Sequence, residues 1–325
     1  MSTATASLAP QAPRSRAVRL SARLVCLSPD VAKGSYYNNP MLDRPTEDKE
    51  LMARFPAYCM PNVWPEGDDC PDLEPAFKAL GRLIVSVGEL VGAQIDAFAA
   101  RAVPGYPPKY LQEVIRTSLD CKVPPHPSAG AAPAHHHRML TAAPRAVPPE
   151  LRGSHQARLL HYFPRTDAGA GPTEPDSWCG WHLDHGALTG LTSAMYMRTN
   201  ADGTRAEVPN PDPNAGLYIR SRAGTLVKAV IPPDCIGFQL GQQMQVASGG
   251  KLRATWHCVQ AAEGPGAVGV ARNTLAVFMQ PNWDAVLTAP PGATEADVDV
   301  AEWKPGQTFA EFTEEVLKKY YAAGM

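Results

Sequence analysis

Two histidines and one aspartate form the residue set in this chain that is best suited to chemistry. His182 and Asp184 stand two positions apart in Trp178-Cys-Gly-Trp-His-Leu-Asp-His185. Side chains two residues apart on an extended strand point to the same face, so this spacing brings an imidazole and a carboxylate together. His257 follows 75 positions later (257 minus 182) and must return to them by pairing of distant strands. Two imidazoles and one carboxylate suit a divalent iron ion and leave positions open for a co-substrate and O₂.

The chain around these residues has the pattern of short strands. From residue 156 onward, apolar segments alternate with turn residues at spacings that suit a sandwich or jelly roll. Residues 198–216 are rich in Asn, Asp and Pro, and we interpret them as an inserted surface loop. We expect strands at 157–163, 181–184, 188–197, 217–220, 225–231, 237–246, 252–260 and 270–279, with a tight turn at Ser248-Gly-Gly250.

The remainder of the chain is patterned mainly as helices. Apolar residues recur at spacings of three and four from Phe77 to Phe98, which predicts one long amphipathic helix. Thr308 and Glu311 have the spacing of a capping box ahead of a C-terminal helix. The other expected elements are a strand at 18–26, a loop at 34–45, and helices at 46–55, 71–100 and 107–119.

Composition favours a soluble globular protein with a small-molecule partner. Of the 325 residues, 44% are hydrophobic and 19% are charged, which is enough apolar material for a real core. A net charge of −2 and a pI near 6.5 argue against binding to nucleic acid, and we expect no membrane partner and a monomer. The seven cysteines contain no C-x-x-C pair, which argues for a reducing compartment. We expect the cytoplasm, with a plastid as the alternative because the first acidic residue is Asp30 and arginines precede it.

Several motifs between Ala157 and Pro281 resemble the isopenicillin-N-synthase-like family of iron(II)- and 2-oxoglutarate-dependent dioxygenases. These motifs occur in the family's order. They are Leu159-Leu-His-Tyr-Phe-Pro164, Trp181-His-Leu-Asp-His-Gly-Ala-Leu-Thr189, Gly237-Phe-Gln-Leu-Gly-Gln-Gln-Met-Gln-Val-Ala-Ser-Gly-Gly250, Trp256-His-Cys-Val259 and Arg272-Asn-Thr274. The resemblance implies an α+β, mainly β fold, with a double-stranded β-helix (jelly roll) core, flanking helices from the N-terminal region and a C-terminal helix. The expected regions are a flexible tail at 1–17, an N-terminal strand and helical region at 18–150 with a Pro/Ala/His-rich loop at 120–150, the dioxygenase domain at 151–300, and a C-terminal helix at 301–325.

The same resemblance assigns roles to individual residues. It implies that His182, Asp184 and His257 hold Fe(II), and that Arg272 and Thr274 bind the distal carboxylate of 2-oxoglutarate. A guanidinium can meet a carboxylate with two parallel hydrogen bonds, and a hydroxyl two positions later adds a third. With O₂, an enzyme of this family would oxidise a small metabolite by hydroxylation, desaturation or ring closure and release succinate and CO₂.

The sequence departs from the family at the residue before Pro164. The family often has a Tyr there that helps to hold 2-oxoglutarate, and this chain has Phe163, so that hydrogen bond is missing unless Tyr162 or His161 substitutes. Two alternatives therefore stay open. One is an oxidase of the same fold that uses no 2-oxoglutarate, either isopenicillin-N-synthase-like or driven by ascorbate. The other is a non-catalytic member that binds a metal or ligand.

Other polar residues near the motifs are expected to lie outside the metal site. Strand alternation turns His185 away from the metal face, and Arg253 is either a surface charge or a substrate contact. The run His135-His-His137 is interpreted as part of a solvated loop, because adjacent residues cannot easily converge on one ion. Substrate specificity is expected in the region before Trp64, in 120–150 and in 198–216.

Overall fold

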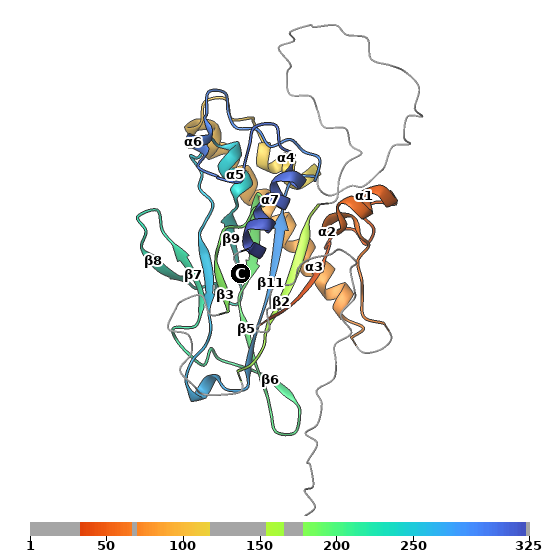
Figure 1. Cartoon of the computed structure of the whole chain (residues 1–325). Coiled ribbons are helices and arrows are strands. Elements are labelled where there is room, and N and C mark those ends of the chain that lie inside the picture. The colour runs from red at the N-terminus through yellow and green to blue at the C-terminus, as the bar shows by residue number, and fades with distance from the viewer. Residues whose placement is uncertain (1–32, 67–69, 118–153, 166–177, 323–325) are drawn as a thin grey trace, which may run out of the picture.

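The core consists of two antiparallel β-sheets that face each other (Figure 1). The computed structural model describes residues 33–66, 70–117, 154–165 and 178–322. The strands are β1 (Lys33–Asn38), β2 (Gln156–Tyr162), β3 (Cys179–His182), β4 (Leu188–Thr192), β5 (Met195–Thr199), β6 (Arg205–Val208), β7 (Gly216–Arg220), β8 (Leu226–Ala229), β9 (Ile236–Leu240), β10 (His257–Gln260) and β11 (Val270–Met279). The helices are α1 (Lys49–Arg54), α2 (Pro56–Cys59), α3 (Leu73–Ala102), α4 (Tyr110–Thr117), α5 (Gln242–Ala247), α6 (Glu295–Val298) and α7 (Phe309–Ala322).

Pairing of distant strands builds both sheets. The larger sheet has the order β1-β2-β11-β4-β9, and β5 pairs with both β11 and β6. The smaller sheet has the order β3-β10-β7-β8. Buried residues from both sheets, such as Tyr162 and Val259, form one cluster between them. The chain is therefore a mixed α and β protein built on facing antiparallel sheets, and its described strands do not form a closed barrel.

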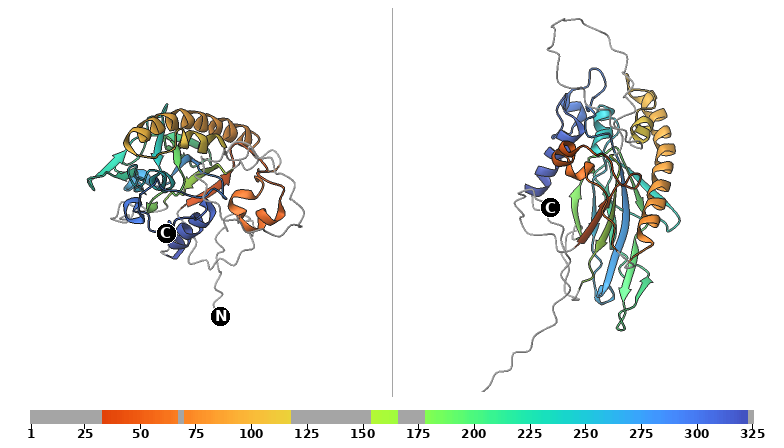
Figure 2. Two further views of the ribbon diagram at one scale, coloured as in Figure 1. Left: turned by 90° about the horizontal axis from the view of Figure 1, so that it is seen from above. Right: turned by 90° about the vertical axis from the view of Figure 1, so that its right-hand side faces the viewer.

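Helix α3 covers the outer face of the larger sheet (Figure 2), as its apolar spacing predicted. Two glycines set the close approach. A Cβ at Gly88 of the helix would lie 2.4 Å from the Met279 sulfur of β11, and a Cβ at Gly190 of β4 would lie 2.3 Å from Ile84 of the helix. By length and composition alone α3 could also span a membrane, which differs from our expectation. Its contacts with β4 and β11 bury part of its apolar surface, whereas Leu83, Leu90 and Phe98 are 53%, 68% and 52% exposed.

A buried carboxylate joins the two helices of the N-terminal half. Asp96 of α3 is 4% exposed, and it accepts hydrogen bonds from the Tyr106 hydroxyl (2.7 Å), the Leu111 amide (2.9 Å) and the Gln112 amide (2.9 Å). The two amides belong to the first turn of α4, where backbone N–H groups have no partner within the helix. Asp96 therefore caps α4 from a neighbouring helix.

We expect Asp96→Ala to lower the free energy of unfolding by about 3 kcal/mol, because three buried donors lose their acceptor. Chemical denaturation of the two proteins measures this difference. The matched control is Asp72→Ala, since Asp72 is exposed and makes no capping bond through its side chain. An equal effect of the two substitutions would show that the buried contacts of Asp96 do not stabilise the fold.

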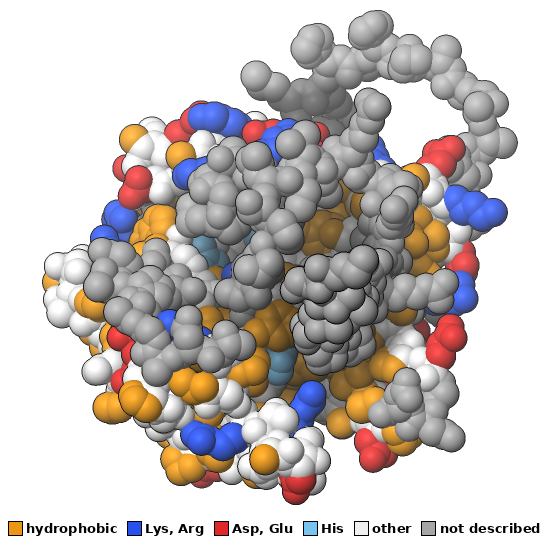
Figure 3. Space-filling model, turned by 60° about the horizontal axis from the view of Figure 1, so that its bottom comes forward, with side chains coloured by type: hydrophobic (Ala, Val, Ile, Leu, Met, Phe, Trp, Pro, Cys, Tyr) orange, Lys and Arg blue, Asp and Glu red, His pale blue; other side chains and the backbone are white. Residues whose placement is uncertain are grey.

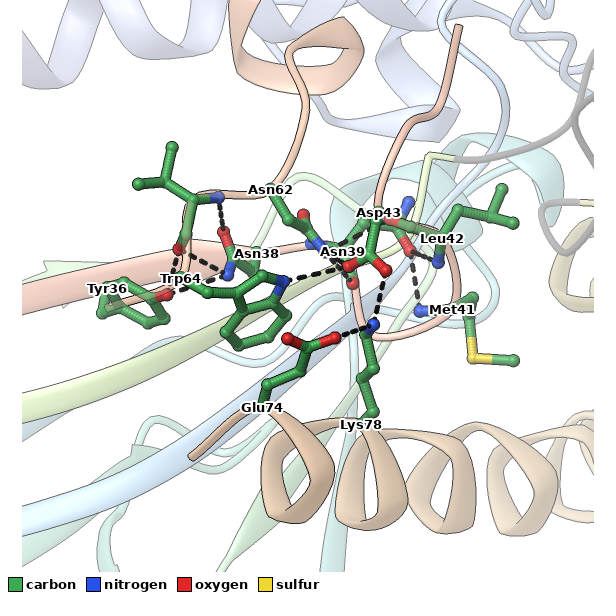
Figure 4. A network of polar contacts seen from close by, with 11 residues as sticks. Tyr36, Asn38, Asn39, Met41, Leu42, Asp43, Asn62, Trp64, Glu74 and Lys78 are labelled. Carbon is green, nitrogen blue, oxygen red and sulfur yellow. Dashed lines mark hydrogen bonds and ion pairs between the residues drawn. The ribbon is translucent and has the colours of Figure 1, made fainter. Parts of the chain in front are cut away.

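A polar network anchors the proline-bracketed segment around Trp64 (Figure 4). The Asn62 side chain accepts a hydrogen bond from the Asn39 amide (2.7 Å) and donates one to the Asn39 carbonyl oxygen (2.8 Å). The Trp64 indole donates to Asp43 (3.0 Å), and Lys78 of α3 pairs with the same carboxylate at 2.5 Å. The segment is thus fixed against α3 and β1.

Several expectations about individual elements were wrong in part. The expected strand 181–184 is instead β3, which ends at His182, so that Asp184 follows the strand. Residues 34–45 are not all loop, because β1 pairs along its whole length with β2. The expected strand 188–197 is two strands, β4 and β5, which pair with different parts of β11. Residues 198–216 contain β6, which forms a hairpin with β5. Only 236–240 of the expected strand 237–246 is extended, since α5 follows, and only 257–260 of 252–260 is a strand.

The capping box at Thr308 and Glu311 and the helix that follows it were predicted correctly, but the helix begins at Phe309 and not at the expected 301. The Thr308 side chain accepts from the Glu311 amide (3.3 Å), and the Glu311 carboxylate accepts from the Thr308 amide (2.9 Å), which is the reciprocal pattern of a capping box. The expected strand 18–26, the tail 1–17, the histidine run and the whole 120–150 loop lie outside the described residues.

Candidate metal and co-substrate site

The structure brings His182, Asp184 and His257 to one point. Their ligand-type atoms all lie within 4.8 Å of one another. His182 Nε2 is 4.0 Å from Asp184 Oδ1, and His257 Nε2 is 3.8 Å from the same oxygen. The pairing of His257 with His182 across β10 and β3 produces this convergence, as the sequence argument required. The three residues form a group that could hold one metal ion.

Backbone carbonyls orient both imidazoles. His182 Nδ1 lies 2.7 Å from the Gly180 carbonyl oxygen, and His257 Nδ1 lies 2.9 Å from the Thr255 carbonyl oxygen. A carbonyl oxygen only accepts, so each Nδ1 carries a hydrogen, and in the neutral form of each ring Nε2 has a free lone pair. In a metal-binding histidine, such a hydrogen bond from the ring nitrogen that does not bind the metal fixes the orientation of the ring. Both Nε2 atoms are therefore prepared to coordinate.

Two side chains donate hydrogen bonds to the second carboxylate oxygen of Asp184. The Thr189 hydroxyl of β4 and the Gln239 amide of β9 each donate to Asp184 Oδ2 at 2.6 Å. This leaves Oδ1 directed at the two histidines. Sequence reasoning did not identify these positioning residues, because the pairing of β4 with β9 that places them cannot be derived from either strand alone.

The first turn of α5 also fixes the loop that carries Asp184. The Gln242 amide donates to the Asp184 carbonyl oxygen (2.8 Å), and the Gln243 amide donates to the Gly186 carbonyl oxygen (3.2 Å). Gly241 permits this approach, since a Cβ there would lie 2.1 Å from the Gly186 oxygen. The helix that replaces part of an expected strand thus positions the carboxylate of the triad.

The electrostatics of the site suit a bound cation. Burial by itself would raise the pKa of Asp184, but His257, His182 and the two hydrogen bonds outweigh it and lower that pKa. Burial and the neighbouring His182 lower the pKa of His257 to about 4, so its imidazole is neutral at pH 7. Burial would also lower the pKa of His182, but Cys179 and Asp184 raise it to about 9. Without a metal, the His182 imidazole is thus protonated on both nitrogens and positively charged at pH 7.

We expect uptake of a divalent metal at pH 7 to release protons, because the metal competes with the proton for the His182 lone pair. Since the His182 pKa is raised to about 9, metal affinity should increase with pH up to that value and fall as the solution becomes more acidic. Calorimetric titration with Mn(II) in two buffers of different ionisation enthalpy gives the proton count. Equal apparent enthalpies in both buffers would contradict the expectation.

A buried guanidinium lies on the inner face of the larger sheet. Arg272 of β11 is only 5% exposed, and its Nε and Nη1 atoms have no hydrogen-bond partner within the described part of the chain. It also bonds to the Tyr196 hydroxyl, and its guanidinium lies 5.1 Å from the centre of the Tyr162 ring. A buried cation with unused donors is costly unless an anion meets it. Arg272 is therefore suited to bind an anionic group such as a carboxylate.

The other residues expected around the co-substrate are placed differently. Tyr162 lies against Arg272, whereas Phe163 is 46% exposed and stacks edge-on against His161. His161 lies 2.7 Å from the Asn273 side chain and faces away from Arg272. The Thr274 hydroxyl shares the Arg272 face, but it donates to the Thr192 carbonyl oxygen (3.2 Å), so it can only accept from a further group.

Two residues of uncertain role lie outside the triad. The His185 ring is 5.9 Å from the Phe309 ring centre, and burial lowers the pKa of His185 to about 4. Arg253 forms an exposed ion pair with Asp299 at 3.0 Å. Arg253 was expected to be either a surface charge or a substrate contact, and this exposed ion pair favours the surface charge.

Comparison with solved structures finds proteins that share this fold. No protein-family model matches the chain, and no curated protein matches its sequence. Solved structures do match. A full-length Neurospora crassa protein in complex with alpha-KG (2-oxoglutarate) is 18% identical with a TM-score of 0.53, and a putative 2OG-Fe(II) oxygenase family protein of Caulobacter crescentus is 17% identical with a TM-score of 0.54. This chain shares their fold.

The matches extend over most of this chain and a smaller share of the others. They cover 88% of this chain in both cases, and 66% of the Neurospora chain and 70% of the Caulobacter chain. The chain thus spans just under two thirds of the length of the Neurospora protein. A further structure of that protein, with alpha-KG and 5-formyluracil, has a TM-score of 0.54 at 18% identity and a coverage of 91% and 71%. At these identities the likeness establishes the fold, and the activity has to be argued from the site.

Proposed function

We propose that this chain is a non-haem iron(II)- and 2-oxoglutarate-dependent oxygenase that oxidises a small-molecule metabolite. The observation that carries the proposal is the pairing of a convergent His182, Asp184 and His257 group with the buried, partly unpaired Arg272 in the same protein interior. Two imidazoles and a carboxylate favour Fe(II) and leave coordination positions open. The fold shared with a 2OG-Fe(II) oxygenase family protein supports it. We also propose a double-stranded β-helix core and membership of the isopenicillin-N-synthase-like group.

The chain's own residues would each have a separate task. His182, Asp184 and His257 would hold Fe(II), while Thr189 and Gln239 keep one oxygen of Asp184 turned toward it. Arg272 would bind the distal carboxylate of 2-oxoglutarate. When bound, iron and 2-oxoglutarate supply the oxidising chemistry, in which O₂ is consumed and 2-oxoglutarate becomes succinate and CO₂.

The position of Tyr162 favours 2-oxoglutarate over the alternative of an oxidase that does without it. That alternative depended on Phe163, which removes a tyrosine from its usual place before the proline. Because Tyr162 lies against Arg272, an aromatic side chain with a hydroxyl group still accompanies the carboxylate-binding guanidinium. The partnerless donors of Arg272 also favour a bound anion, and 2-oxoglutarate supplies a carboxylate for them.

Slow turnover in the absence of any primary substrate tests the proposal. We expect the protein with Fe(II), O₂ and 2-oxoglutarate to release succinate, and we expect no release when Fe(II) is omitted. Arg253→Gln should behave as the unaltered protein, because Arg253 belongs to a surface ion pair. Absence of both succinate release and 2-oxoglutarate binding in the iron-loaded protein would refute the assignment.

A further inference from the structure

A second arginine shares the inner face of the larger sheet with Arg272. Arg158 of β2 lies opposite Ala276 of β11, and it is four residues before Tyr162, which lies against Arg272. Because strand side chains alternate, residues four apart point to the same face. Arg158 therefore points toward the space between the two sheets, where the candidate metal site also lies.

Neighbours on β1 hold this guanidinium without neutralising it. Arg158 Nε and Nη2 both donate to the Ser35 hydroxyl, at 3.0 and 2.7 Å, and its guanidinium carbon is 5.1 Å from the centre of the Tyr37 ring. The edge formed by Nη1 and Nη2 keeps three N–H donors. No carboxylate or other acceptor takes them in the ranges that the structure describes. The side chain is thus oriented, charged and half-buried, with one edge directed to a further group.

The surroundings of Arg158 are cationic. Lys33 of β1 shares this face, and its ammonium donates to the Trp178 carbonyl oxygen at 3.5 Å. The next residue, Cys179, has its sulfur 3.9 Å from His182 Nδ1, which places both cations on the side of the metal site. By strand register, no Asp or Glu of the described larger-sheet strands points to this face. Figure 3 likewise shows Lys and Arg side chains among hydrophobic ones, with most acidic side chains near the rim.

We infer that Arg158 binds a carboxylate of the primary substrate, so that the substrate class is a small organic acid. This inference rests on the proposed function. Since 2-oxoglutarate is assigned to Arg272, the uncompensated charge of Arg158 calls for an additional anion. A planar guanidinium edge meets a carboxylate with two parallel bonds, and the Tyr37 ring alongside offers an apolar surface for the attached carbon skeleton. Ser35 is the positioning residue that fixes the orientation of the guanidinium.

Proton NMR of two probe molecules tests the inference. Benzoate and benzamide have nearly the same shape, but only benzoate carries the charge. With Mn(II) in the metal site and saturating 2-oxoglutarate, a probe that binds beside the metal has broadened signals. We expect broadening of benzoate and none of benzamide. Arg158→Gln should weaken benzoate binding about ten- to hundred-fold, Ser35→Ala should weaken it less, and 2-oxoglutarate affinity should change less than about two-fold in both.

Controls distinguish a failure of this inference from a failure of the proposed oxygenase function. Arg205→Gln, which removes an exposed guanidinium from β6 of the same sheet, should leave benzoate binding unchanged. Equal broadening by the two probes, an unaffected Arg158→Gln variant, or no broadening of benzoate with Mn(II) and 2-oxoglutarate bound would overturn the inference alone. Loss of 2-oxoglutarate binding in Arg158→Gln would instead assign Arg158 to the co-substrate. Failure of the unaltered protein to bind Mn(II) and 2-oxoglutarate would refute the proposed function and the inference together.

Discussion

Replacing His257 with alanine should abolish turnover of 2-oxoglutarate and weaken Fe(II) binding by about hundred-fold or more. Residues that merely orient a metal ligand are typically worth about ten- to hundred-fold in affinity, so loss of a ligand should reach at least the upper end of that range. His257 is 6% exposed and faces both Asp184 and His182, so no other described side chain can take its place. Metal content after dialysis and succinate release measure the two effects.

The matched control for this experiment is another partly buried histidine of the same sheets. His161 lies beside Asn273 and faces away from Arg272, so His161→Ala should keep metal binding and turnover within about two-fold of the unaltered protein, as expected for a change far from the chemistry. Unchanged O₂ consumption by His257→Ala would contradict the assignment of His257 as a ligand.

Arg272→Leu should reduce 2-oxoglutarate affinity by about hundred-fold or more, since removing one partner of a buried charge pair costs about 2–5 kcal/mol. Metal binding should be unaffected, because Arg272 makes no contact with the triad in the structure. Arg272→Lys should recover part of the affinity, as it keeps the charge and loses the planar fork. Equilibrium binding of 2-oxoglutarate to the Mn(II)-loaded protein measures the affinities of the unaltered protein and of both variants.

The same substitution distinguishes a binding role from a structural one. Arg272 is buried with unused donors, and replacing such a group by an apolar one of similar volume is often neutral or stabilising. We therefore expect Arg272→Leu without ligands to unfold at the same temperature as the unaltered protein or at a higher one. A marked loss of stability, with 2-oxoglutarate affinity retained, would make Arg272 a structural residue.

The triad could be predicted from the sequence mainly through strand pairing, although Asp184 lies in the loop after β3 and not on the expected strand 181–184. His182 and Asp184 are two apart, and His257 begins a strand that pairs directly with His182. The long helix was predictable for a similar reason, as its apolar residues follow the helical repeat and its Gly88 lies where the sheet comes closest. In these places the local pattern and the tertiary packing agree.

The supporting residues could not be predicted, because they depend on which strands become neighbours. Thr189 and Gln239 meet Asp184 only through the pairing of β4 with β9, and Arg158 faces the interior only through the register of β2 with β11. Helix α5 was missed since its residues also suit a buried strand. Its first turn is stabilised by carbonyl groups of 184–186, a tertiary contact that no local pattern indicates.

Anaerobic titration of the protein with Fe(II) and then 2-oxoglutarate tests the central claim most directly. If the triad holds the iron and Arg272 binds the far carboxylate, a weak visible absorption band from the iron chelate of 2-oxoglutarate should develop to one equivalent, and Arg272→Leu should require a much higher 2-oxoglutarate concentration. Iron that binds without producing this band at saturating 2-oxoglutarate, or no specific uptake of iron, would contradict it.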